Sequence, residues 1–222
     1  MRAGPRRRKC HSRGAVKLCS NTGVQRGKYF DGYLHADRAP LGVQNRGMDT
    51  IVRQAMAKWP NVPACYGWLG LDARGHWYLR DDEAQAKGNF AQSKGSWLRH
   101  EKLLAFIGRN YQADAYGQWY FQNGPQRVYV ELECATWVWR VLPDLQLQSQ
   151  IGSHLLGTKC VLDTQGRVYL ETAAGLVLVH SLDTGLVADA LERGVWEVEE
   201  VPTESLPDRY GFVLSPEQAQ RR

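Results

Sequence analysis

One eight-residue pattern occurs three times in this chain and constrains its fold more than any other feature. The copies are "DARGHWYL" from Asp72, "DAYGQWYF" from Asp114 and "DTQGRVYL" from Asp163. An Asp in the first position of a turn can bond its own backbone two residues further on, and a Gly in the fourth position accepts a positive φ. The aromatic and β-branched residues that follow favour a strand. Each copy therefore predicts a β-hairpin whose turn glycine has a positive φ.

Helical periodicity occurs in three segments that alternate with these hairpins. The first is "MDTIVRQAMAKW" (48–59), with Asp49 as a candidate N-cap. The second is "SWLRHEKLLAFIGRNY" (96–111), with Ser96 as a candidate N-cap, and a shorter helix is expected in "DTGLVADALERG" (183–194). The two stronger patterns predict that their apolar stripes face inward, namely Ile51, Val52, Ala55, Met56 and Trp59 in the first and Leu103, Leu104, Phe106 and Ile107 in the second.

This order of elements predicts an α+β fold, because hairpins imply an antiparallel sheet. We expect repeated antiparallel β-hairpins with two to three packing helices, and late strands in "VWEVEEV" and "YGFVL". With 222 residues, 43% of them apolar, the chain can bury one core or two small cores that share an interface. We expect a disordered basic segment (1–47), a hairpin-helix-hairpin domain (48–142) and a second, smaller hairpin-containing part (143–222).

The positive charge of the chain belongs to its first 47 residues. That segment holds eleven Lys and Arg against two acidic residues, a formal charge of +9, whereas the remainder holds 17 against 21, a formal charge of −4. The segment has no Trp and no apolar periodicity, so its burial cannot offset the entropy of ordering it. Three interpretations stay open: an over-extended reading frame that truly starts at Met48, a basic arm for nucleic acid or an anionic surface, and an Arg-rich targeting peptide.

The five cysteines form no CxxC pair. Cys10 and Cys19, even with His11, do not supply the four closely spaced ligands of a structural zinc site. The other three, Cys65, Cys134 and Cys160, lie in predicted strands, where a free thiol packs as a small apolar group. We therefore expect a reducing, cytoplasmic compartment, with no metal, no cofactor and no membrane span.

Motifs for catalysis are missing from the sequence. It contains no G-x-S-x-G elbow, no Walker loop and no H-E-x-x-H zinc helix. His100 and Glu101 are adjacent, so on a helix they point about 100° apart and cannot act as a zinc-binding pair. The acidic run from Asp81 to Glu83 is interpreted as a solvated loop. We therefore expect a protein that is not an enzyme and has no catalytic residues.

Polar residues at two chain reversals form the candidate ligand site. If the second helix packs on the hairpin that follows it, an arginine and several amides converge at one edge, where they suit a carboxylate or phosphate. The alternative is a scaffold role, in which these residues complement the helix dipole, end the helix or form the turn. The residues are Arg109, Asn110, Gln122, Asn123 and Arg127, with Gln126 beside them.

The chain resembles a family of uncharacterised bacterial proteins, a domain of unknown function, from Met48 to about Val141 and more loosely to Gly194. The residues that carry this resemblance are "KWPNVPACYGWLGLDARGHWYL", "LLAFIGRNY" and "WYFQNGPQRVYVELE". More distantly it is similar to a second uncharacterised bacterial family with repeated hairpin and helix motifs and a proposed role in ligand sensing or signal transduction. The resemblance implies a fold and a bacterial origin, and no established catalytic residues.

Three functions follow from these observations. The favoured one is a non-catalytic ligand-sensing or regulatory module for a small anionic ligand. The alternative is a protein-protein interaction module, with homodimerisation as one form, because seven of the eight tryptophans lie between Trp59 and Trp139 and exceed what one small core hides. Nucleic-acid binding is third, because the acidic remainder of the chain repels phosphates and only residues 1–47 attract them.

Overall fold

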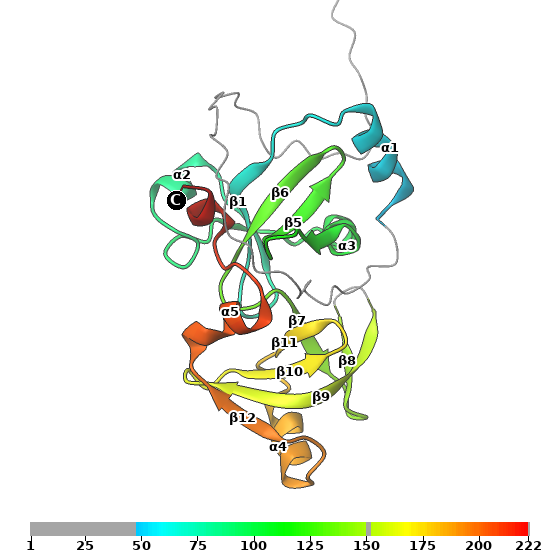
Figure 1. Cartoon of the computed structure of the whole chain (residues 1–222), viewed down its shortest axis with the longest axis vertical. Helices are drawn as coiled ribbons and strands as arrows, with labels where there is room; N and C mark the ends of the chain where they lie inside the picture. The colour runs from blue at the N-terminus through cyan, green and yellow to red at the C-terminus, as the bar shows by residue number, and fades with distance from the viewer. Residues whose placement is uncertain (1–47, 150–151, 222) are drawn as a thin grey trace, which may run out of the picture.

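The computed structural model describes residues 48–149 and 152–221, which form two β-sheets arranged along the long axis of the molecule (Figure 1). Segment 1–47 lies outside the described residues. The expectations of a disordered basic segment, of an alternative start and of a Cys10, His11 and Cys19 group therefore lie outside them as well.

The first sheet contains six strands in the order β3-β2-β1-β6-β5-β4. Neighbouring strands are antiparallel except β1 and β6, which are parallel and join the β1-β2 hairpin of the first repeat to the β5-β6 hairpin. The strands are β1 (Cys65–Leu71), β2 (Trp77–Leu79), β3 (Ser96–Trp97), β4 (Tyr111–Ala113), β5 (Trp119–Asn123) and β6 (Gln126–Leu132).

The second sheet has the order β10-β11-β7-β8-β9-β12, and β9 also pairs with β10. The extra pairing closes β7, β8, β9, β10 and β11 into a ring, so this part of the chain is a small barrel. The strands are β7 (Val138–Val141), β8 (Gln146–Gln148), β9 (His154–Asp163), β10 (Val168–Thr172), β11 (Gly175–Val179) and β12 (Val198–Val201).

Three helices of nine residues match the three predicted ones: α1 (Thr50–Lys58), α3 (Glu101–Arg109) and α4 (Thr184–Glu192). The remaining helical segments are short: α2 (Asp82–Ala86), α5 (Leu206–Tyr210), α6 (Pro216–Arg221) and the 3-10 turn η1 (Thr203–Ser205). The mixture of helices with hairpin-rich sheets confirms the predicted α+β class.

The repeated turns have the predicted geometry. Gly75, Gly117 and Gly166 have φ angles of 78°, 75° and 76°. In each turn, Oδ1 of the first-position aspartate accepts hydrogen bonds from the backbone N–H groups two and four residues later, at 2.8 to 3.0 Å. The three D-x-x-G copies are therefore equivalent hairpin turns.

The other oxygen of each turn aspartate accepts a tyrosine hydroxyl. Asp72 and Asp163 bind the tyrosine of their own repeat, Tyr78 and Tyr169, each at 3.2 Å. Asp114 differs, because its Oδ2 accepts from Tyr129 on the neighbouring strand β6, at 2.9 Å. The second turn is therefore bonded to the strand that follows its own β4-β5 hairpin as well as within itself.

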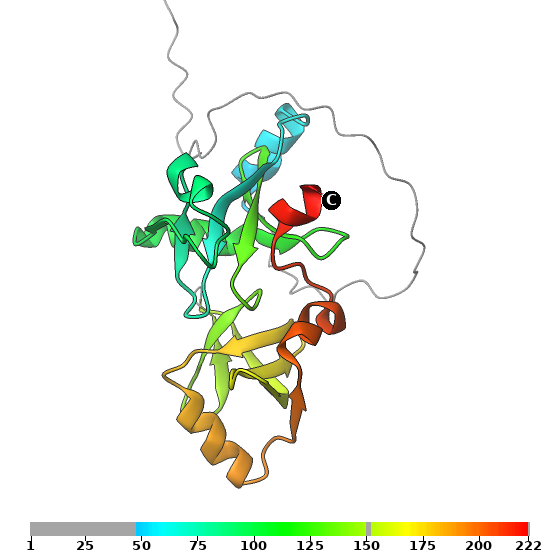
Figure 2. The same cartoon turned by 90° about the vertical axis from the view of Figure 1, so that its left-hand side faces the viewer.

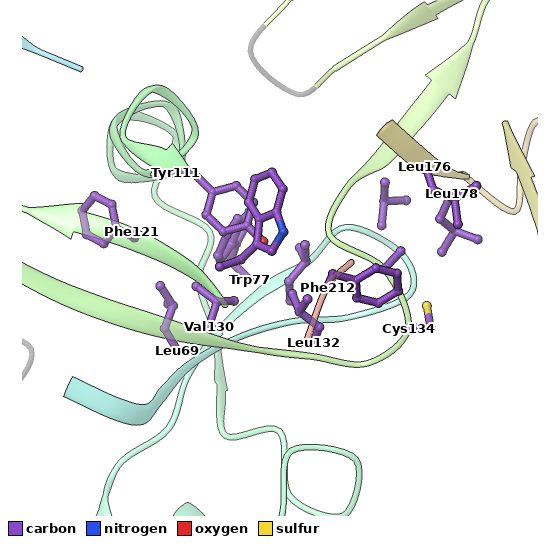
Figure 3. Packing of buried hydrophobic residues seen from close by; sticks show 14 of the residues in the cluster. Leu69, Trp77, Tyr111, Phe121, Val130, Leu132, Cys134, Leu176, Leu178 and Phe212 are labelled. Atoms are coloured by element: carbon purple, nitrogen blue, oxygen red, sulfur yellow. The ribbon is translucent and has the colours of Figure 1, made fainter. Parts of the chain in front are cut away.

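A continuous core joins the two sheets (Figure 3). Leu69, Phe121 and Val130 of the first sheet belong to the same cluster as Leu176 and Leu178 of the second. A second cluster fills the barrel and includes Trp139, Val141, Leu147, Cys160 and Val177.

The C-terminal segment returns from the second sheet to the first (Figures 1 and 2). Gly211 ends α5 with a φ of 67°, and Phe212 enters the shared core beside Leu132 (Figure 3). The N–H of Val213 then donates to the carbonyl of Gly117 at 3.0 Å. The predicted strand in "YGFVL" is therefore wrong: its apolar residues anchor a crossing segment to the core.

Two details of the predicted helices are also corrected. Ser96 does not cap a helix but lies in β3 opposite Leu79, and α3 begins only at Glu101, where His100 Nδ1 accepts the N–H of Leu103. In α1, only Val52 of the expected apolar stripe is buried. Helical periodicity does not predict the strand at residues 96–97, because pairing with β2, a tertiary interaction, decides their conformation.

Replacing the turn glycines separates local strain from docking of the C-terminal segment. Both Gly117 and Gly166 have φ angles near 75°, so an added Cβ costs roughly 1 kcal/mol of unfolding free energy at either. At Gly117 that Cβ would also lie 2.3 Å from the carbonyl oxygen of Gly211, whereas nothing lies within 4 Å at Gly166. We expect Gly117→Ala to cost at least about 1 kcal/mol more than Gly166→Ala in urea unfolding. An equal loss of unfolding free energy in the two variants would contradict the docking of the C-terminal segment on the second turn.

Candidate functional site

Arg109 and Asn110 end α3 and face the start of α1. The Arg109 guanidinium donates to both carboxylate oxygens of Asp49, at 3.2 and 3.3 Å. Oδ1 of Asn110 accepts the backbone N–H of Asp49 at 3.0 Å, and its Nδ2 donates to the carbonyl of Phe106 at 2.9 Å. Asp49 stands at the N-cap position, but its side chain makes no cap bond. These residues tie α1 to α3.

Gln122 and Arg127 meet elsewhere, on the β5-β6 hairpin. They stand directly opposite each other in the ladder, so their side chains leave the same face of the sheet. The next pair on that face is Tyr120 and Tyr129. Asn123, one position along, points to the opposite face because side chains alternate along a strand. The predicted site residues therefore form two separate groups, one at the α1-α3 junction and one on this hairpin.

The Gln122 and Arg127 group lines a cavity of about 380 Å³. One wall is the face of β5 and β6 that carries Gln122 and Arg127, which we call the outer face. The other wall is the chain that runs from α1 to β1 past the end of the hairpin (Figure 1). The lining residues are Met56, Trp59, Pro60, Val62, Ala64, Gln122, Pro125, Arg127 and Tyr129. We call this space the hairpin cavity.

Arg127 is the cation of the hairpin cavity. Its guanidinium carbon lies 4.9 Å from the ring centroid of Tyr120, which orients the planar group. Tyr129 stands beside it, stacked on Tyr66 with ring centroids 4.5 Å apart. Burial, followed by the hydrogen bond to Asp114, raises the pKa of Tyr129. The Tyr129 hydroxyl therefore stays protonated and keeps donating to Asp114.

Gln122 supplies a buried acceptor. Its side chain is fully buried, and its Nε2 donates to the carbonyl of Gly124 at 2.9 Å. A carbonyl oxygen only accepts, so this bond fixes which end of the amide is Oε1. Within the part of the chain that the structure describes, Oε1 has no hydrogen-bond partner. A buried acceptor without a partner costs about 1 to 3 kcal/mol. Because the Gln122 side chain has no exposed surface, this oxygen is closed to a molecule in the cavity.

A second cavity, of about 610 Å³, lies between the first repeated turn and α3. Trp97 lines it with 45% of its surface exposed, the Arg99 guanidinium lies 4.1 Å from its ring centroid, and the His76 ring lies 4.5 Å away. Leu98 and Leu104 add apolar walls. We call this space the Trp97 cavity.

The described residues hold no cluster of three or more His, Cys, Asp or Glu side chains that could bind a metal ion. Cys134 and Cys160 are free thiols inside the protein, and burial raises the pKa of Cys134 to about 12. The expectation of a free thiol at Cys65 is wrong, because Cys65 is disulfide-bonded. Across residues 48–149 and 152–221, no helix has the length and apolar character needed to cross a bilayer. The hairpin cavity offers the Arg127 guanidinium and apolar walls, which are groups that can bind a ligand.

The sequence did not indicate the second wall of the hairpin cavity. The helical periodicity predicts a Trp59 that faces inward, yet Trp59 is 49% exposed and lines the cavity together with Met56. The signal available in the sequence was Pro60, which ends the helix directly after Trp59 and leaves that ring at a chain reversal.

Comparison with known proteins identifies a family. The family model DUF2944, described as "Protein of unknown function (DUF2946)", matches residues 48–217. Among solved structures, the chain is similar to a DUF1285 family protein from Silicibacter pomeroyi DSS-3, with 11% identity and a TM-score of 0.41, over 69% of this chain and 85% of that one. No curated protein matches the chain.

Two substitutions test the scaffold role of the α1-α3 junction. Asn110 is buried and bonds both Asp49 and Phe106, so Asn110→Ala leaves two partly buried backbone groups without these bonds and is expected to cost about 1 to 3 kcal/mol of unfolding free energy. The Arg109 side chain is 49% exposed, so Arg109→Ala is expected to cost at most about 1 kcal/mol. Urea denaturation measures both. A larger loss from Arg109→Ala would reverse this assignment.

Proposed function

The chain belongs to this family of unknown function, and we propose that it is a non-catalytic module that binds a small anionic ligand in the hairpin cavity. The observation that carries the proposal is the Arg127 guanidinium, which stacks on the Tyr120 ring and lines the cavity. A sensing or regulatory role in the bacterial cytoplasm is part of the same proposal.

Arg127 suits an anion for two reasons. Its planar guanidinium can give two parallel hydrogen bonds to a carboxylate, and contact with the Tyr120 ring limits the entropy lost on binding. The cavity volume of about 380 Å³ falls within the range of small-molecule sites. A ligand there would touch both the sheet and the segment that follows α1, so binding would brace one against the other.

Protein-protein interaction remains the second candidate, favoured by the exposure of Trp97. Trp59 and Trp97 line two different cavities, so they would serve separate contacts. Concentration-dependent dimerisation in sedimentation experiments, lost in Trp97→Ala, would support this candidate. Nucleic-acid binding rests on segment 1–47, outside the described residues.

Titration with a plain carboxylate tests the ligand-binding proposal. We expect 4-methylpentanoate to raise the melting temperature of the protein and to bind in calorimetry. We expect Arg127→Ala to weaken that binding about tenfold or more, because a hydrogen bond to a charged group is lost. Arg99→Ala is the matched control, since it removes an arginine that also stacks on an aromatic ring but lines the Trp97 cavity.

The two variants separate the outcomes. Weakened binding in Arg127→Ala with unchanged binding in Arg99→Ala supports the hairpin cavity. Equal binding in wild type and Arg127→Ala, or no binding of the carboxylate or of inorganic phosphate to wild type, would overturn the proposal.

A further inference from the structure

We propose that the Trp97 cavity binds a free α-amino acid with a large apolar side chain. This cavity is separate from the hairpin cavity, so the inference goes beyond the proposed function and does not depend on it. It follows from two accessible side chains of opposite charge that line the Trp97 cavity beside apolar walls.

The two charged side chains are those of Arg99 and Glu101. Both line the Trp97 cavity and both are exposed, so a molecule in the cavity can reach them. Within residues 48–149 and 152–221, the Arg99 guanidinium stacks on the Trp97 ring, and neither Arg99 nor Glu101 has an ion-pair partner. One cavity therefore contains a cation and an anion, each of which can pair with a bound molecule.

The backbone holds these two side chains close together. Trp97, Arg99 and Glu101 occupy alternate positions from β3 to the start of α3, and all three line the cavity. His100, between the last two, is extended, with a φ of −76° and a ψ of 103°. In an extended chain, side chains two positions apart leave the same side, and their Cα atoms are about 6.5 Å apart. One small molecule can therefore reach both charges.

A molecule that pairs with both charges carries a carboxylate and an ammonium group. A guanidinium binds a carboxylate through two parallel hydrogen bonds, and the Glu101 carboxylate accepts from an ammonium group. A free α-amino acid carries both groups on one carbon atom. A plain carboxylate leaves Glu101 unpaired and meets its negative charge. We therefore do not expect 4-methylpentanoate, the probe for the hairpin cavity, to bind here.

The remaining walls specify an apolar side chain. Trp97, Leu98 and Leu104 line the cavity, and a ligand side chain would withdraw their surface from water. His76 is already engaged, because its Nδ1 lies 3.5 Å from Oδ2 of Asp72 and its ring packs on Trp97. The volume of about 610 Å³ falls within the range of small-molecule sites and suits an aromatic amino acid. Phenylalanine is the simplest probe.

Four probes test the inference on the full-length protein. The first is phenylalanine, and each of the others lacks one part of it: 3-phenylpropanoate the ammonium group, 2-phenylethylamine the carboxylate, and alanine the ring. The Trp97 indole N–H signal in a nitrogen-15 NMR spectrum measures the affinity for each probe. We expect phenylalanine to bind wild type about tenfold more tightly than any of the other three, because each of them loses one set of contacts.

Two neutral substitutions of similar size assign the charges. In Glu101→Gln, we expect phenylalanine to bind about tenfold more weakly, whereas 3-phenylpropanoate binds at least as tightly as to wild type because repulsion of its carboxylate is gone. In Arg99→Gln, phenylalanine weakens likewise and 2-phenylethylamine binds at least as tightly. Loss of structure would weaken all probes together. Lys102→Gln is the matched control, because Lys102 follows Glu101 on α3 but does not line the cavity.

Three results would overturn the inference. The first is equal affinity of wild type for phenylalanine and 3-phenylpropanoate. The second is an unchanged affinity for phenylalanine in both Glu101→Gln and Arg99→Gln. The third is a Trp97 signal that phenylalanine does not move, including the case in which only the Trp59 signal moves. Each of these results leaves the proposed function standing, because 4-methylpentanoate and Arg127→Ala test a different cavity.

Discussion

The rest of the structure depends on the hydrogen bonds that the aspartate carboxylate accepts inside each repeated turn. Oδ1 of Asp72, Asp114 or Asp163 holds two backbone N–H groups, and Oδ2 holds a tyrosine hydroxyl. Three bonds to one carboxylate compensate for withdrawing its charge from water. At Asp114 the tyrosine is Tyr129 of β6, so this turn also fixes the strand that carries Arg127.

The outer face of β6 is covered at both ends by segments distant in sequence. Residues 56–64 cover the end that carries Arg127 and form the hairpin cavity. At the other end, the buried Glu131 accepts the backbone N–H of Glu217 at 3.1 Å and the Ser215 hydroxyl. One end is therefore closed by a satisfied polar network, whereas the other holds a cavity with an unsatisfied acceptor.

Local rules predicted the features that local interactions decide. The turn glycines and the nine-residue helices follow from residues within a few positions of one another, as Gly166 and α4 show. Tertiary contacts decide the rest. Ser96 joins β2, the apolar run after Gly211 enters a core built by other strands, and Asp49 draws Arg109 away from the hairpin. The pairing of Gln122 with Arg127 can be predicted from the sequence because a short hairpin joins the two residues. The position of Trp59 beside them cannot, because more than 60 residues separate Trp59 from that hairpin.

The two exposed tryptophans provide the most direct test of the central claim, that ligand binds on the outer face of β5 and β6. Trp59 lines the hairpin cavity and Trp97 lines the other one, so their indole N–H signals in a nitrogen-15 NMR spectrum report on the two spaces separately. On addition of 4-methylpentanoate, the account predicts that the signal of the Trp59 indole moves while that of the Trp97 indole stays in place. Movement of the Trp97 signal with no change at Trp59 would contradict it.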